Sequence, residues 1–111
     1  MGVTKTDLFS TTQNEIAVAA KAFAHPARVA IIQHLLSTNA CVNGDLVQEL
    51  GLAQATVSQH LRELKDIGII QGTIEGSRIS YCISPARWAE IKGQFNEIFN
   101  QFETPSSQGC C

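Results

Sequence analysis

The stretch from Leu52 to Ile70 constrains the fold most strongly, because the spacing of its apolar residues changes partway along it. Val57, Leu61 and Leu64 recur at the spacing of one helical face, with polar residues opposite them. Beyond Gly68 the apolar residues alternate with polar ones, as they do in a half-buried strand. The stretch therefore predicts an amphipathic helix that runs directly into a β-strand.

The outward face of this expected helix, residues 54–65, carries side chains that can hydrogen-bond base edges and phosphates. We therefore interpret it as a DNA recognition helix. Its candidate DNA-contacting residues are Gln54, Ala55, Thr56, Ser58, Gln59 and Arg62. Ala53 occupies the position where a Ser or Thr cap is expected, and this costs about 1 kcal/mol of helix stability.

Two β-rich runs, 69–74 and 79–84, predict a hairpin whose turn is 75–78. Arg78 near the tip is expected to reach a phosphate or a narrow minor groove, and the alternative is a solvated charge on a turn. The alternation predicts that Ile79, Tyr81 and Ile83 share one face, which packs on the helices. Ser80, Cys82 and Ser84 share the other face.

Three helices are expected before the recognition helix. The first spans 13–24, the second starts at Pro26 and runs to about Ser37, and a short third one ends at Gly51. The residues expected to face inward on the first two are Ile16, Ala19, Ala20, Phe23, Val29, Ile32, Leu35 and Leu36. Together these patterns predict a mainly α-helical winged helix-turn-helix domain with a small β-hairpin. We place this domain at residues 13–103, between an N-terminal arm (1–12) and a flexible tail (104–111).

A last helix is expected from Pro85 to about Glu103, with its aromatic and aliphatic residues in a single stripe. So small a core does not need all of these side chains, and we predict that they join a second copy of the chain in a twofold homodimer. The alternative is that the helix only covers its own domain. The residues predicted at the dimer interface are Phe23, Trp88, Ile91, Phe95, Ile98, Phe99 and Phe102.

Composition limits the functions available to this chain. Its 111 residues, 44% of them hydrophobic, suit one folded domain. Eight basic residues face ten acidic ones, so a DNA-binding surface would have only a thin basic footprint and modest non-specific affinity. The sequence shows no signal peptide and no apolar run that could span a membrane, and we expect a cytoplasmic protein without a membrane partner. Neither a phosphate-binding loop nor a nucleophile elbow is found, and an enzyme is not expected.

Three segments, AFAHPARVAIIQHLL, DLVQELGLAQATVSQHLRELKDIGII and EGSRISYCIS, together resemble the ArsR/SmtB family of bacterial transcriptional repressors. The resemblance covers residues 16–102, and the second segment is its most specific part. It implies a homodimer on a double-stranded DNA operator, released by a metal, a metalloid or a thiol-reactive signal. Carried over by position, the recognition helix is Gln54–Lys65 and the wing is Thr73–Tyr81.

The sensor must be inferred from this chain, because family members place it differently. The last helix contains no His, which disfavours the zinc site that some members carry there. Cys41 matches the first cysteine of another family site, but Asn43 occupies the place of the second. The chain ends in Cys110-Cys111, and from Glu103 the seven following residues reach roughly 23 Å when extended.

A three-thiolate site of Cys41, Cys110 and Cys111 would suit As(III), Sb(III) or another thiophilic metal ion as inducer, with no cofactor required. Three alternatives remain open at this point. One is a redox-sensing repressor in which Cys41 and a tail cysteine form a disulfide, and another is a winged-helix protein-interaction module. The third is an inert tail. Cys82 is expected to be a small filler on its strand, and His60 to pack or to hydrogen-bond to the backbone.

Overall fold

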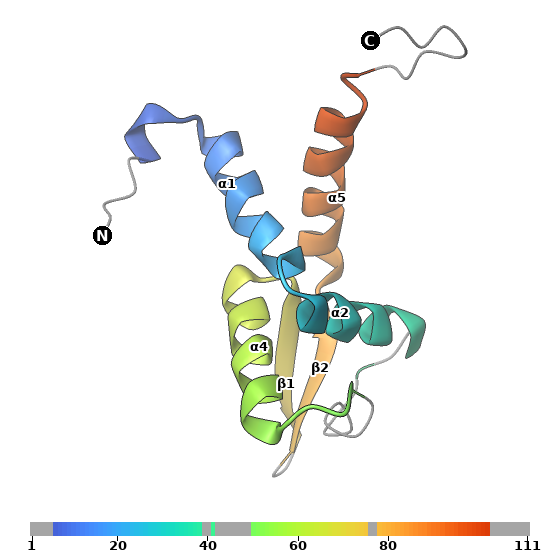
Figure 1. The fold of residues 1–111 in the computed structure, drawn as a ribbon. Coiled ribbons are helices and arrows are strands. Elements are labelled where there is room, and N and C mark those ends of the chain that lie inside the picture. Colours follow the sequence, from blue (N-terminus) through green and yellow to red (C-terminus); the bar gives the residue numbers. More distant parts are fainter. Residues whose placement is uncertain (1–5, 39–40, 42–49, 76–77, 103–111) are drawn as a thin grey trace, which may run out of the picture.

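The chain folds into helices and one β-hairpin in a computed structural model that describes residues 6–38, 41, 50–75 and 78–102. The hairpin packs with α2 and α4, while α1 and α5 extend from them toward the same side of the molecule (Figure 1). The mainly α-helical fold with a small hairpin is thereby confirmed. In chain order the elements are η1 (Thr6–Leu8), α1 (Thr11–Ala20), η2 (Lys21–Phe23), α2 (Pro26–Thr38), α4 (Gln54–Ile67), β1 (Ile70–Glu75), β2 (Arg78–Ile83) and α5 (Pro85–Phe99).

The start of α1 is fixed by a reciprocal cap. The backbone N–H of Gln13 donates to Ser10 Oγ at 3.0 Å, and the backbone N–H of Ser10 donates to Gln13 Oε1 at 2.9 Å. This helix therefore begins at Thr11, two residues earlier than predicted, and passes into the 3-10 turn η2. Helix α2 begins at Pro26 as predicted. The short helix expected before Gly51 falls mostly on 42–49, which lie outside the described residues.

The core lies where α2, α4 and the hairpin meet. Val57, Leu61 and Leu64 of α4 are all buried there, which confirms the predicted inward face of this helix. Two inward faces were predicted correctly only in part. On α2, Ile32 and Leu35 are buried as predicted, but Ile31 is also fully buried and Leu36 is 45% exposed, because the buried face runs through positions 27, 31, 32 and 35. Ala19 of α1 is buried as predicted, whereas Ala20 is exposed and Ala22 of η2 is buried instead, since the tighter turn shifts the phase.

The hairpin pairs β1 and β2 as antiparallel neighbours from Ile70 opposite Ile83 to Glu75 opposite Arg78. Tyr81 and Ile83 pack against the core, as predicted for one face of β2. The other face of β2 is covered as well, since Ser80 is only 4% exposed and Cys82 is half-buried. The reason is that β2 also packs against α2, so both faces of this short strand are partly covered.

A tight junction joins α4 to the hairpin. Gly68 has a φ of 95°, and its N–H donates to the carbonyls of Leu64 (3.1 Å) and Lys65 (3.0 Å). Arg87 of α5 donates from Nε to the carbonyl of Ile67 at 3.4 Å, and the N–H of Ser84 donates to the carbonyl of Ile69 at 3.0 Å. The end of α4 is therefore fixed to the start of α5 and to the root of the hairpin.

Helix α5 ends at Phe99, earlier than the predicted end near Glu103, and Phe102 lies beyond it. The last turn closes at Asn100, whose N–H donates to the carbonyl of Asn96 at 2.9 Å. Among the described helices, none is long and apolar enough to cross a membrane.

Replacing Gly68 with Ala should lower the free energy of unfolding by about 1–2 kcal/mol, because a left-handed φ strains any residue with a Cβ. Gly93→Ala is the matched control. This position lies within α5, and an added Cβ would meet no atom within 4 Å there, so alanine should raise the free energy of unfolding by up to about 1 kcal/mol. Urea denaturation of both variants measures this, and a Gly68→Ala protein as stable as the parent would contradict the account.

Candidate DNA interface and cysteine pair

The outward face of α4 carries the predicted DNA-contacting residues. Gln54, Ala55, Thr56, Gln59 and Arg62 are all exposed, and Ser58 is half-buried. The helix has no side-chain cap at Ala53, as the sequence predicted. The backbone N–H groups of its first turn are thus left for water or for an anionic ligand such as a phosphate.

Polar side chains on this face are held by neighbours on the same helix. Gln54 Nε2 donates to Ser58 Oγ at 3.2 Å, and Gln59 Nε2 donates to Glu63 Oε2 at 3.4 Å. Both contacts are exposed and long, so the amides can exchange them for base edges at small cost. The face is able to read bases in a groove of DNA.

The wing lies next to α4, because β1 begins only two residues after Gly68. The backbone of Arg78 pairs with Glu75 at the outer end of the hairpin, so these two residues belong to the strands and not to the turn, where they were predicted. The side chain of Arg78 lies outside what the structure describes. The position near the tip agrees with the prediction, and its contact with DNA stays a prediction.

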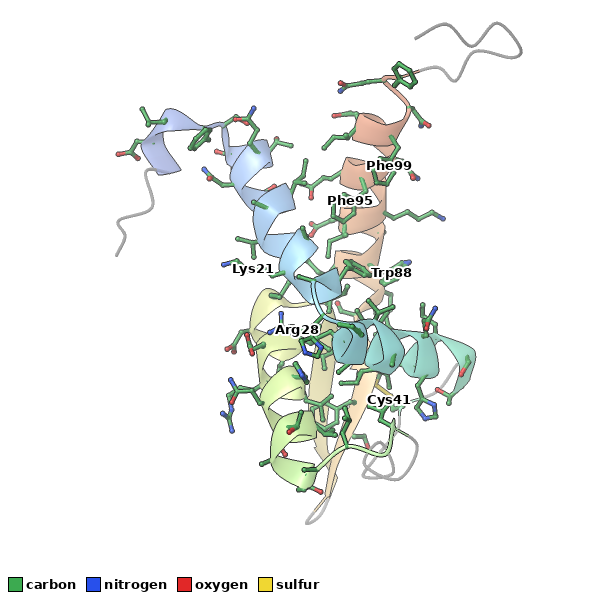
Figure 2. All side chains as sticks on the ribbon, viewed as in Figure 1. Lys21, Arg28, Cys41, Trp88, Phe95 and Phe99 are labelled. Atoms are coloured by element: carbon green, nitrogen blue, oxygen red, sulfur yellow. A yellow bond between two sulfur atoms is a disulfide. The ribbon has the colours of Figure 1, made fainter. Side chains whose placement is uncertain are left out.

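Behind α4, Arg28 of α2 holds the recognition helix by its side chain. One guanidinium nitrogen forms an ion pair with Glu63 at 2.6 Å, and Nε donates to His60 Nδ1 at 3.2 Å. A further nitrogen donates to the carbonyl of Lys21 at 2.6 Å. Arg28 thus ties α4 to both α2 and η2. Figure 2 shows Arg28 beside α4, with Lys21 above it. This role was not predicted from the sequence, where the only signal for it was a cation in the first turn of a mostly apolar helix.

His60 is 8% exposed, and its ring lies 4.6 Å from that of His25, centroid to centroid. Its packing role was predicted correctly, but its hydrogen-bond partner is a guanidinium and not the backbone. Burial, together with the nearby charges of His25 and Arg28, lowers the pKa of His60 below its usual value of 6.5, and Glu63 opposes this shift. Hydrogen bonds from Arg28 and Gln59 lower the pKa of Glu63.

The predicted dimer residues differ in what they contact and in how far they are exposed. Phe23, Trp88 and Phe95 form edge-on contacts with centroids 6.3–6.4 Å apart, and Phe95 stacks on Phe99 at 6.0 Å. Phe99 and Phe102 are 69% and 75% exposed, and Ile98 is also exposed. Ile91 differs from these, because it is only 3% exposed and belongs to the core of its own protomer.

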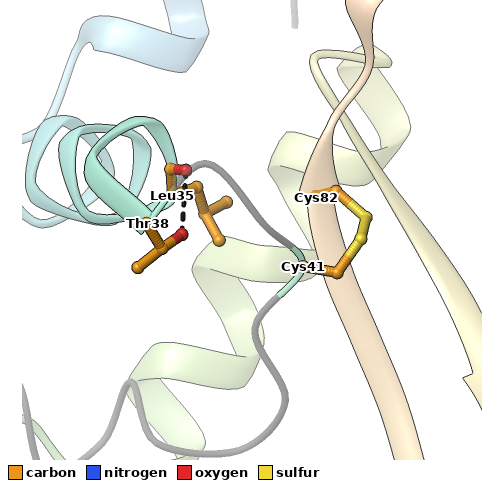
Figure 3. The surroundings of a disulfide bond; sticks show 4 residues. All are labelled: Leu35, Thr38, Cys41 and Cys82. Carbon is orange, nitrogen blue, oxygen red and sulfur yellow. Dashed lines mark hydrogen bonds between the residues drawn. A yellow bond between two sulfur atoms is a disulfide. The ribbon is translucent and has the colours of Figure 1, made fainter.

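Cys41 and Cys82 form a disulfide, with their Cα atoms 4.4 Å apart (Figure 3). Cys82 is therefore not the small filler that the alternating pattern predicted. The disulfide connects the segment after α2 to β2, the second strand of the wing. In this state the sulfur of Cys41 is not a thiolate, so it is not a metal ligand. Cys110 and Cys111 lie outside the described residues, within which no group of three or more His, Cys, Asp or Glu could hold a metal ion.

A helix with an exposed polar face, seated on a core and followed at once by a two-stranded wing, defines a winged-helix protein of the DNA-binding transcription-regulator class. Residues 25–71 match the family model described as bacterial regulatory protein, arsR family. The chain belongs to this family of regulators, which are not enzymes.

Similar proteins agree with this assignment. The chain is 31% identical to the biofilm growth-associated repressor of Xylella fastidiosa over 78% of this chain and 75% of that protein. It is 29% identical to the HTH-type transcriptional regulator CmtR of Mycobacterium tuberculosis over 83% of this chain and 77% of that one. Among solved structures, HlyU from Vibrio cholerae superposes with a TM-score of 0.66 at 25% identity, covering 85% of this chain and 98% of that one.

Lowering the pH below about 6.5 should reduce the free energy of unfolding, since the unfolded chain then protonates His60 more readily than the folded one. The stability that neutral His60 contributes is present above its unfolded pKa and is lost as pH falls through the lower folded value. Thermal or urea unfolding between about pH 7.5 and about pH 5.5 measures the slope.

His60→Gln, whose amide oxygen can still accept from Arg28, should flatten this slope. The same change at His34, which lies on α2 far from the first turn that holds Arg28, should leave the slope unchanged. Equal slopes in the parent and the His60 variant would show that other groups cause the pH dependence.

Proposed function

We propose that the protein is a cytoplasmic homodimeric repressor that binds a double-stranded DNA operator and leaves it when a thiophilic signal reaches its cysteines. The observation that carries the DNA-binding part is the exposed polar face of α4, which stands beside the wing. Gln54, Ala55, Thr56, Ser58, Gln59 and Arg62 would contact bases and phosphates in the major groove, and Arg78 the backbone or the minor groove.

The dimer is supported by the apolar surface that α1 and α5 leave uncovered. Beyond the core, Phe99, Phe102 and Ile98 on and after α5 and Val18 on α1 are exposed to solvent. Exposed aromatic side chains grouped on one side of a small domain favour association with a second copy. A twofold dimer would present two recognition helices, so that the operator carries two related half-sites.

The charge balance supports a repressor that depends on base contacts. Helix α4 carries Arg62 and Lys65 against Glu63 and Asp66, and is neutral overall. The ion pair with Arg28 compensates Glu63 from behind, which reduces its repulsion of phosphates. Sequence-independent attraction to DNA is therefore small, and specific contacts together with the doubling of half-sites must supply more of the affinity.

The test of this function is binding to the DNA upstream of the protein's own gene at two salt concentrations. The mass of the protein in solution is measured alongside, and twice 12.0 kDa is expected. A specific complex with a shallow salt dependence supports the repressor. A folded dimer that forms no specific complex favours the alternative function, a winged-helix module that binds protein.

Gln59→Ala should weaken operator binding by about 1–3 kcal/mol and leave binding to unrelated DNA nearly unchanged, since an outward amide reads a base edge. Gln33→Ala, the same change on the exposed side of α2, serves as the control and should alter neither. Titration of labelled duplexes gives both constants. Equal losses on the two DNAs would contradict a base-reading role for Gln59.

For the inducer, we propose a thiophilic metal or metalloid ion, As(III) or Sb(III) for example, held by Cys110, Cys111 and Cys41. Adjacent thiolates suit soft ions, and a third would complete a three-coordinate site. Cys41 can take part only after its disulfide with Cys82 is reduced, because a metal needs the thiolate. No other cofactor is part of the proposal.

Replacing both Cys110 and Cys111 with Ser should leave operator affinity unchanged and abolish release by arsenite added to the reduced protein. The absorption of thiolate-to-metal bonds, followed during titration, should fall in the same variant. Cys82→Ser is the control that keeps all three proposed ligands. Unchanged release from the double variant would remove the tail from the sensor.

A further inference from the structure

An apolar groove of about 450 Å³ opens between the C-terminal half of α2, the root of the hairpin and the start of α5. Leu35 and Leu36 line it from α2, Ile83 from β2 and Trp88 from α5. None of the described side chains that line the groove carries a charge. Leu36 is 45% exposed, so the wall of the groove that it forms is open to a molecule arriving from solvent.

The disulfide between Cys41 and Cys82 lies in the wall of this groove. Cys41 is exposed and Cys82 is half-buried. Cys82 is held in place by strand pairing, opposite Gln71 of β1. Cys41 follows the end of α2, where Thr38 Oγ1 donates to the carbonyl of Leu35 at 3.1 Å (Figure 3). The two cysteines thus meet at a place where an apolar molecule can dock.

We propose that Cys41 and Cys82 form a redox-active dithiol which apolar organic hydroperoxides oxidise, and that the groove binds the carbon skeleton of the hydroperoxide. The oxidised product is the disulfide of this structure. The chemistry stands independently of the proposed repressor function, and only its effect on DNA binding rests on that function.

The reaction balances with the hydroperoxide as the only oxidant. The thiolate of Cys41, the more exposed of the pair, attacks the outer oxygen of R–O–OH, and the O–O bond breaks. The alkoxide leaves as R–OH after taking up a proton, and Cys41 becomes a sulfenic acid. The sulfur of Cys82 then attacks the sulfur of Cys41, the S–O bond breaks, and water leaves. Two thiols and one hydroperoxide thus give one disulfide, one alcohol and one water.

The apolar lining selects among oxidants. Hydrogen peroxide has no carbon skeleton and gains nothing from the walls that Leu35, Leu36 and Trp88 provide. An alkyl or aryl hydroperoxide buries apolar surface there, which raises its concentration beside Cys41. An anionic oxidant would find no cation among the described lining residues.

The disulfide is also placed to change DNA binding. It ties the segment between α2 and α4 to β2 of the wing, and so connects elements on both sides of the recognition helix. DNA binding requires α4 and the wing to fit one duplex together. A bond between Cys41 and β2 limits how α4 and the wing can be arranged relative to each other. Operator affinity is therefore expected to differ severalfold between the dithiol and the disulfide.

The test uses the full chain with Cys110→Ser and Cys111→Ser, so that Cys41 and Cys82 are the only thiols. The protein is reduced, freed of reductant, and mixed with cumene hydroperoxide or with hydrogen peroxide. Free thiols are counted over time, and the fluorescence of Trp88, the only tryptophan, is followed. Two thiols should disappear for each cumene hydroperoxide consumed, about tenfold faster than with hydrogen peroxide, as the burial of one apolar group predicts.

Leu36→Gln should bring the two rates together, since it makes the groove more polar at an exposed position. Leu8→Gln, the same substitution at an exposed residue outside the groove, should keep the difference between the two rates. Cys82→Ser should stop at the sulfenic acid, so that the protein gains the mass of one oxygen atom on Cys41.

Equal rates with the two peroxides, or a Leu36→Gln protein that still prefers cumene hydroperoxide, would overturn the selectivity of the groove. Operator affinity is then compared in the two redox states, and equal affinities would overturn the coupling to DNA. A protein that binds no operator in either state, yet reacts as described, would refute the repressor function and leave the hydroperoxide chemistry standing.

Discussion

The seating of α4 on the core is the interaction on which the rest of this structure depends. Its apolar stripe, Val57, Leu61 and Leu64, packs beneath a helix whose other face must stay exposed. Apolar packing alone leaves such a helix able to rotate or slide. The guanidinium of Arg28 restricts this motion, because it binds Glu63 and His60 on α4 and the carbonyl of Lys21 at once. These polar contacts, together with the junction at Gly68 and Arg87, hold the angle at which the polar face is presented.

The two ends of the molecule differ in structure and in the role that we assign to each. At one end, α2, α4 and the hairpin form a core that supports the exposed polar face of α4. At the other end, α1 and α5 extend away from this core (Figure 1). Val18, Ile98 and Phe99 on these helices are exposed. Arg87 and Ser84 join these ends, since they fix the start of α5 to the end of α4 and to the strand that follows it. A change in how α5 packs would be transmitted to the recognition helix through this junction.

The cysteines illustrate how a local pattern can mislead. On a strand where it alternates with serines, Cys82 has the pattern of a small filler residue. In the fold it lies opposite the end of α2, because β2 packs against that helix as well as against β1. Its partner, Cys41, is 41 residues away in sequence. Neither helix or strand propensity nor residue spacing predicts a contact between positions so far apart. The pairing depends on how α2 crosses the hairpin.

The sequence by itself determined the nature and order of the elements. The period of 3.6 in 54–67, the change to a period of 2 after Gly68 and the proline at position 26 fix a helix, a wing and a helix start through local backbone physics alone. The exposed residues of α4 follow from the same periodicity.

Only the tertiary structure decided that Ile31 and not Leu36 of α2 is buried. It also decided that Arg28 reaches His60 and Glu63, and that Cys41 meets Cys82. These contacts depend on crossing angles and on the packing of both faces of the hairpin. They arise between segments far apart in the chain, where the pattern of one segment carries no information about the other.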